Sequence, residues 1–291
     1  MEYSRREFGQ MLIAGLPVTT MKGLDYLSQE SIPENGWQND LPVGTLHHHV
    51  YHSALAGDDR DYFVYTPSGY NSQGARLYPV LYLLHGYSDT ADAWTTKGHA
   101  NEILDSLIAK EKAEPMIAVM PLCYRTPEVR ALGWKGLRNP HLRQITFKEL
   151  GRILLDEVIP AVEKDYRAAT DRELRAVAGL SLGGAESLYI GLNALDRFAW
   201  VGGFSTVGLV GDYNEAFPGF DDRANSRLGV LWISCGKQDP FFLLSERLRD
   251  WLQAKRIRFK WVNTSGAHTW QVWKQNFSDF VPLLFRRGKN P

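Results

Sequence analysis

A regular alternation between two kinds of segment narrows the possible folds of this chain more than any other feature. From about residue 40, short apolar or β-branched runs alternate with longer stretches whose apolar residues recur at helical spacing. The runs that predict strands are 45–53, 61–67, 78–86, 116–121, 174–181, 200–205, 229–236 and 258–263. The expected helices are 101–110, 147–166, one from 182, 243–255 and one just after 268. The pattern indicates an α/β protein, with a mostly parallel central sheet and helices on both faces.

The first two expected strands are joined directly by a turn sequence, AGDDR, and therefore predict an antiparallel hairpin at the N-terminal edge of the sheet. The first strand carries His47, His48, His49 and His52. Successive side chains of a strand point to opposite faces, so these imidazoles do not converge on one ion without a bulge. We interpret them as solvent-facing residues of an edge strand, with a metal site as the alternative, and we expect no metal.

A long loop is expected over residues 122–146, after the fourth strand. It contains five basic residues, namely Arg125, Arg130, Lys135, Arg138 and Arg143. The loop is interpreted as solvated; the alternative is a basic surface over the pocket that meets an acidic substrate such as a glucuronate-bearing xylan.

The N-terminus is treated separately from the fold. Paired Arg5 and Arg6 precede Phe8 and a modest apolar run, an arrangement typical of a twin-arginine export signal. Residues 1–30 are therefore expected to be an export leader or a disordered N-terminus, and residues 31–291 a single catalytic domain. The alternative is a plain amphipathic leader on a cytoplasmic protein.

Charge and composition limit the partners. The 33 basic and 33 acidic residues give a formal net charge of zero, so nucleic acid and anionic membranes are not expected partners. No apolar run reaches the roughly 18 residues needed to span a bilayer.

Cys123 and Cys235 are expected to be buried free thiols. No phosphate-binding loop or dinucleotide-binding turn occurs, so we expect chemistry without a cofactor.

The sequence GLSLGG (179–184) lies between an expected strand and an expected helix. A nucleophilic serine on a tight strand-to-helix turn needs small neighbours, which Gly179 and Gly183 provide. Ser181 is therefore the candidate nucleophile.

A serine hydroxyl needs a base within hydrogen-bond distance and a carboxylate that orients the base. Asp239 follows one expected strand and His268 follows the next, which is the chain order Ser, acid, His that this motif requires. We predict His268 as the base and Asp239 as the acid. The competing acids lie in a polar loop and are Asp212, Asp221 and Asp222.

Two backbone amides should bind the oxyanion that forms when Ser181 attacks an acyl carbon. Leu182 follows the nucleophile, and Tyr87 follows Gly86 in the loop after the third strand. We predict the amides of Leu182 and Tyr87. His85 is interpreted as a brace for this loop, with a catalytic role as the alternative.

Three of the nine tryptophans are candidates for the substrate pocket, because flat aromatic rings suit sugars and aromatic acyl groups. These are Trp94, Trp134 and Trp270, with core packing as the alternative. Trp273 and the helix behind it are expected to anchor the loop of His268 in the core.

The segments PVLYLLHGYSDTADAW, AVAGLSLGGAESL, ISCGKQD and GAHTWQVWK occur here in that order. With this set the chain resembles the putative esterase family related to esterase D, and within it the bacterial feruloyl esterases of carbohydrate esterase family 1. The resemblance implies an α/β-hydrolase fold, the roles given above for Ser181, Asp239, His268, Tyr87 and Leu182, and release of hydroxycinnamoyl groups from xylan. Alternatives are other acyl specificities (acetyl-xylan, siderophore ester or S-formylglutathione), acyl transfer, or a carbohydrate-binding protein on a hydrolase scaffold.

Overall fold

The computed structural model describes residues 41–123, 131 and 139–286, and residues 42–291 cluster as one compact unit. The expected leader (1–30), Trp134 and four of the basic loop residues, Arg125, Arg130, Lys135 and Arg138, lie outside the described residues. The following paragraphs concern the compact unit.

Eight strands form one sheet in the order β1-β2-β4-β3-β5-β6-β7-β8. Their bounds are β1 Thr45–Ser53, β2 Asp58–Thr66, β3 Val80–Leu84, β4 Ile117–Pro121, β5 Arg175–Leu180, β6 Trp200–Phe204, β7 Val230–Gly236 and β8 Lys260–Thr264. The pairs β1·β2 and β2·β4 are antiparallel, and the other five are parallel. The expected α/β architecture and its antiparallel edge hairpin are confirmed.

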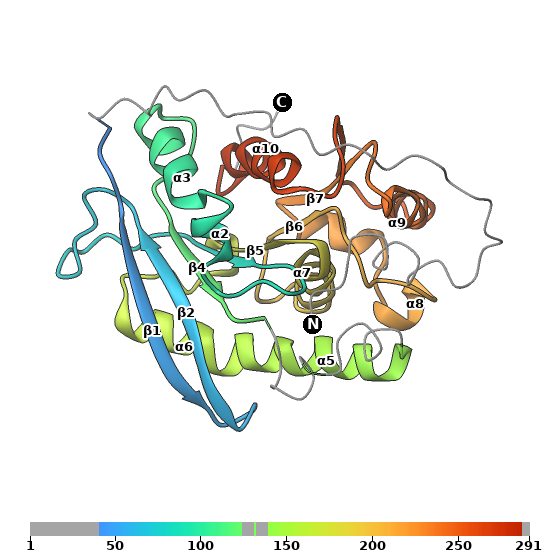
Figure 1. Cartoon of the computed structure of the whole chain (residues 1–291), viewed down its shortest axis with the longest axis horizontal. Helices are drawn as coiled ribbons and strands as arrows, with labels where there is room; N and C mark the ends of the chain where they lie inside the picture. Colours follow the sequence, from blue (N-terminus) through green and yellow to red (C-terminus); the bar gives the residue numbers. More distant parts are fainter. Residues whose placement is uncertain (1–40, 124–130, 132–138, 287–291) are drawn as a thin grey trace. The chain divides into compact units, whose positions relative to one another are not determined.

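Helices cover both faces of the sheet. In the described ranges the α-helices are α2 Ala93–Thr96, α3 Ala100–Ala109, α5 Pro140–Ile153, α6 Ile159–Asp165, α7 Ser181–Asn193, α8 Tyr213–Ala216, α9 Phe242–Ala254 and α10 Trp270–Phe280. Short 3-10 turns are η2 Arg172–Leu174, η3 Asp222–Ser226 and η4 Val281–Leu283. Helices α3 and α10 pack together on one face, whereas α5 packs with α7 on the other (Figure 1).

The expected loop over 122–146 is too long by seven residues, because α5 begins at Pro140. Proline is favoured in the first turn of a helix, and the Asn139 side chain accepts hydrogen bonds from the amides of His141 and Leu142. Arg143 is therefore helical rather than part of a solvated loop. It is 7% exposed, and burial lowers the pKa of its guanidinium.

The single helix expected over 147–166 is interrupted by η1, a π-helical turn at Leu154–Val158. Pro160 follows in the first turn of α6, where it has no amide hydrogen to donate and its ring crowds the carbonyl four residues earlier. The wider turn before it accommodates both effects.

The prediction that the edge histidines face solvent is wrong for two of the four. His48 and His52 are exposed as expected, but His47 and His49 are only partly exposed and lie on the other side of β1, beside Tyr166. The two-residue period of the strand separates the two pairs.

Candidate active site

Ser181 occupies the turn at which β5 ends and α7 begins. Its backbone φ is +54°, in the left-handed region, and its side chain is buried near the end of a strand. The neighbouring glycines permit this turn: a Cβ on Gly179 would lie 2.4 Å from the Gly183 carbonyl oxygen, and one on Gly183 would lie 2.3 Å from that of His85. The steric reason for both glycines is thus confirmed.

The three residues predicted for the triad form one chain of hydrogen bonds. His268 Nε2 lies 2.9 Å from Ser181 Oγ, and His268 Nδ1 lies 2.8 Å from Asp239 Oδ2. The Asp239 side chain is fully buried, and that of His268 is 14% exposed. With Nδ1–H donating to the carboxylate, Nε2 has its lone pair directed at the serine hydroxyl.

The three competing acids are occupied elsewhere. Asp212 caps α8 by accepting a hydrogen bond from the Asn214 amide. Asp221 pairs with Arg223 and Asp222 pairs with Arg256, both at the surface. The structure therefore brings only Asp239, of the four candidates, to His268.

The loops that carry the acid and the base are tied to each other. The Gln238 amide donates to the Gly266 carbonyl at 3.0 Å, and the Gly266 amide donates to the Gln238 side-chain oxygen at 2.6 Å. Because these bonds flank Asp239 and His268, they fix the separation of the two loops at the carboxyl ends of β7 and β8.

Two aromatic residues that were not predicted for the site pack against the His268 ring edge to face. Phe241 lies 5.0 Å and Trp273 lies 4.8 Å from it, centroid to centroid. The Phe241 amide also donates to Asp239 Oδ1 at 2.9 Å. Trp273 is 7% exposed, as expected for a core anchor, but it contacts the base directly. The sequence contains one signal that could have identified Phe241 as a site residue, namely its position two residues after the acid Asp239.

The loop after β3 lies against the nucleophile. A Cβ on Gly86 would lie 3.4 Å from Ser181 Cβ, so the backbone that leads into Tyr87 passes close to the serine. Leu182 lies in the first turn of α7, where backbone amides have no acceptor within the helix. Leu182 directly follows Ser181, and the backbone just before Tyr87 approaches it, so the oxyanion role of the two amides stays a prediction.

The bracing role expected of His85 is confirmed. Its Nδ1 donates to the Gly86 carbonyl at 2.8 Å, while its Nε2 accepts from the Cys123 amide at 3.0 Å. Cys123 and Cys235 are both buried free thiols, as expected.

A buried carboxyl group also lies on α7, five residues after the nucleophile. Glu186 is 1% exposed, and its Oε2 accepts no hydrogen bond in the described part of the chain. Burial raises the pKa of Glu186 well above its usual value, and the charge of Arg60 only partly opposes this.

Trp94 does not line a pocket, contrary to its predicted role. The side chain is fully buried among Trp270, Phe204 and Phe277, and its Nε1–H donates to the Leu84 carbonyl at 2.9 Å. Trp270 is partly exposed and lies edge to face with Trp94 and Trp273. Trp94 is thus a core residue that holds the end of β3, next to the loop that carries Tyr87.

Replacement of Trp94 by phenylalanine tests this correction. The variant loses the bond to the Leu84 carbonyl and leaves a void, so we expect the free energy of unfolding to fall by about 1–3 kcal/mol. Thermal unfolding measures this, with Trp261→Phe on the partly exposed β8 as the control, expected within about 0.5 kcal/mol. A stable variant with a several-fold higher KM for a small ester would instead indicate that Trp94 contacts substrate.

Within the described ranges, His, Cys, Asp and Glu side chains form no group of three or more able to hold a metal ion. The search for membrane spans covered the same residues and found no helix with the length and apolar character to cross a bilayer.

The fold and the site together define a class. A mostly parallel eight-stranded sheet, a serine on a strand-to-helix turn, and an aspartate and a histidine after later strands are the arrangement of the α/β-hydrolases. The chain belongs to the family described as "Putative esterase", whose model matches residues 53–285. By family and fold it is a carboxylic ester hydrolase.

Comparison with known proteins agrees with this family. An endo-1,4-beta-xylanase/feruloyl esterase of Xylanibacter ruminicola is 28% identical over 86% of this chain, which spans only 32% of that protein. A ferulic acid esterase of Anaeromyces mucronatus, solved with ferulic acid, has a TM-score of 0.73 at 24% identity, covering 86% of this chain and 93% of that one. The S-formylglutathione hydrolase of Staphylococcus aureus has a TM-score of 0.62 at 19% identity, covering 84% and 99% respectively. These solved structures share the fold.

Proposed function

We propose that this chain is a serine carboxylesterase that hydrolyses carbohydrate-linked esters, with feruloyl and related hydroxycinnamoyl esters of plant xylan as its substrates. The observation that carries the proposal is the hydrogen-bonded chain from Ser181 through His268 to Asp239 at the carboxyl edge of the sheet.

In the proposed acylation step, the Ser181 oxygen attacks the ester carbonyl carbon while neutral His268 Nε2 takes the hydroxyl proton. Asp239 orients the ring and stabilises the imidazolium that forms. The amides of Tyr87 and Leu182 donate to the carbonyl oxygen as it becomes negative. When the tetrahedral intermediate collapses, the sugar alkoxide leaves with the proton from His268, and the acyl group remains on Ser181.

Deacylation repeats these steps with water as the nucleophile. His268, neutral again, takes a proton from water as its oxygen attacks the acyl carbon, and then returns a proton to the Ser181 oxygen. Since only neutral imidazole accepts these protons, we expect the activity to fall in acid.

The acyl and sugar preferences rest on likeness to relatives. One curated relative is named as a xylanase/feruloyl esterase, and a neighbour in fold is a ferulic acid esterase. Other neighbours in fold are an S-formylglutathione hydrolase and an enterobactin esterase, so these ester classes are the alternatives. Acetyl-xylan hydrolysis, acyl transfer and non-catalytic carbohydrate binding remain as rivals.

Parallel kinetic assays distinguish the substrates. We expect kcat/KM for methyl ferulate to exceed that for methyl benzoate by at least about tenfold, because the ring substituents add contacts in the acyl pocket. Acetylated xylan and S-formylglutathione serve as the competing substrates. Faster turnover of either one would replace the feruloyl assignment, whereas folded protein inert to every ester and to a fluorophosphonate probe would favour the carbohydrate-binding alternative.

Export forms part of the proposal. A plant cell-wall polymer is met outside the cell, in agreement with the export signal expected around Arg5 and Arg6. Recovery of the protein only from the cytoplasmic fraction of its host would contradict export.

A further inference from the structure

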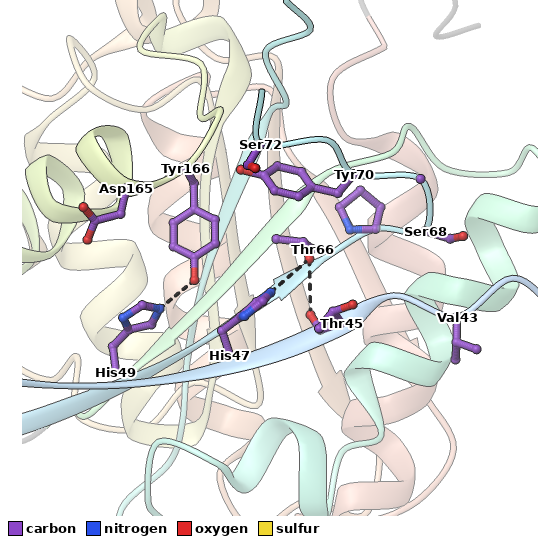
Figure 2. Close-up of a pocket in the computed structure, with 12 residues that line it drawn as sticks. Val43, Thr45, His47, His49, Thr66, Ser68, Tyr70, Ser72, Asp165 and Tyr166 are labelled. Atoms are coloured by element: carbon purple, nitrogen blue, oxygen red, sulfur yellow. Dashed lines mark hydrogen bonds between the residues drawn. The ribbon is translucent and has the colours of Figure 1, made fainter. Parts of the chain in front are cut away.

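A cavity lies away from the triad, between the edge hairpin and the end of α6. Its volume is about 480 Å³, within the range of small-molecule sites. The lining comes from the start of β1, the turn after β2 and the end of α6, and Figure 2 shows the His49 and Tyr166 side chains pointing toward one another across it.

The topology places this cavity at the sheet edge opposite the catalytic residues. Ser181, Asp239 and His268 follow the carboxyl ends of parallel strands. The cavity instead adjoins Thr66 at the end of β2, and β2 runs antiparallel to β4. A ligand bound there does not occupy the catalytic centre.

The walls of the cavity combine polar and apolar surface in about equal parts. Hydroxyl groups come from the side chains of Thr45, Thr66, Ser68, Ser72, Tyr70 and Tyr166. His49 Nε2 lies 2.6 Å from the Tyr166 hydroxyl. Burial lowers the pKa of His49 and raises that of Tyr166, so the neutral imidazole accepts from the phenol and its Nδ1–H remains a donor. A ligand that carries hydroxyl groups can exchange hydrogen bonds with these polar groups, which an apolar ligand cannot.

The charge of the lining limits the ligand further. No lysine or arginine is among the lining residues, and the exposed Asp165 is the one acidic residue. A phosphate, a sulfate or a uronic acid would meet a negative charge with no compensating cation. The neighbouring hydroxyl groups of a neutral sugar, in contrast, donate well to the Asp165 carboxylate. The rings of Tyr70 and Tyr166 offer apolar faces to sugar C–H groups.

We propose that this cavity, defined by His49, Ser72, Asp165 and Tyr166, is an accessory binding site for neutral sugar residues. The choice of xylan as the polymer rests on the proposed function. Because the cavity is separate from the triad, it holds the polymer without taking part in ester cleavage. Its loss therefore raises KM for feruloylated arabinoxylan, while kcat and the hydrolysis of methyl ferulate stay unchanged.

Calorimetric titration with xylohexaose, which carries no ester, tests the site. Ser72 is exposed, so Ser72→Trp blocks the cavity without disturbing the core; Asp165→Asn removes the charge and keeps the shape. We expect Kd to rise by at least about fivefold in each variant, the loss of roughly one good hydrogen bond. The matched controls are Gln253→Trp on α9 and Asp196→Asn, both exposed and outside the cavity, and both are expected to bind as the unmodified chain does.

Methyl ferulate hydrolysis, measured on the same proteins, reports folding and the triad alone. Two results would overturn the accessory site. One is absence of xylohexaose binding to the unmodified chain. The other is a Kd in Ser72→Trp and Asp165→Asn equal to that of the unmodified chain. Absence of methyl ferulate hydrolysis with xylohexaose binding retained would overturn the proposed function and leave the accessory site standing.

Discussion

Replacement of Ser181 by alanine is expected to lower kcat/KM for methyl ferulate by at least about 10⁴-fold. The variant removes the oxygen that attacks the ester, which lies 2.9 Å from His268 Nε2. Alanine lacks only this oxygen, so the turn between β5 and α7 is kept. The backbone amides beside it still polarise the carbonyl, and they account for whatever slow hydrolysis by water remains. Steady-state kinetics, with circular dichroism to verify the fold, make the measurement.

Ser187→Ala is the matched control, because Ser187 is a buried serine on the same helix whose hydroxyl donates to the Gly183 carbonyl. Its activity should stay within about threefold of the unmodified chain, since it makes no contact with the base. Hydrolysis unchanged by Ser181→Ala, or lost equally in both variants, would contradict the proposed nucleophile.

Local sequence was sufficient to predict the nucleophile turn. The constraint at Gly179 and Gly183 comes from backbone atoms a few residues away and from one neighbouring strand, so the short motif already contains it. The parallel direction of most strands could be predicted for a similar reason, since alternating β and α segments imply parallel pairing wherever a helix intervenes.

The tryptophan and histidine environments could not be predicted from local sequence. Whether Trp94 lines a pocket or fills the core depends on Trp270 and Phe277, which lie more than 170 positions later in the chain. Likewise, His49 is turned from solvent by Tyr166, on a different element. Strand periodicity predicts which residues share a face, but the element that packs on that face is a property of the whole fold.

Asp239→Asn is expected to lower kcat/KM for methyl ferulate by about 10³–10⁴-fold with little change in stability. The Phe241 amide donates to Asp239 Oδ1, so in the variant it holds the asparagine carbonyl oxygen at that position. The new NH₂ group then faces His268 Nδ1 and donates to it. The imidazole proton is thereby moved to Nε2, which can no longer accept the proton of Ser181.

The position of the proton distinguishes this explanation from a general loss of charge. Asp222→Asn removes the same charge from a competing acid that pairs with Arg256 at the surface, and its activity should stay within about twofold. The ¹⁵N chemical shifts of His268 should report an Nδ1–H tautomer in the unmodified chain and an Nε2–H tautomer in Asp239→Asn. An unchanged tautomer combined with a large loss of rate would mean that Asp239 acts mainly by stabilising the imidazolium rather than by orienting a neutral base.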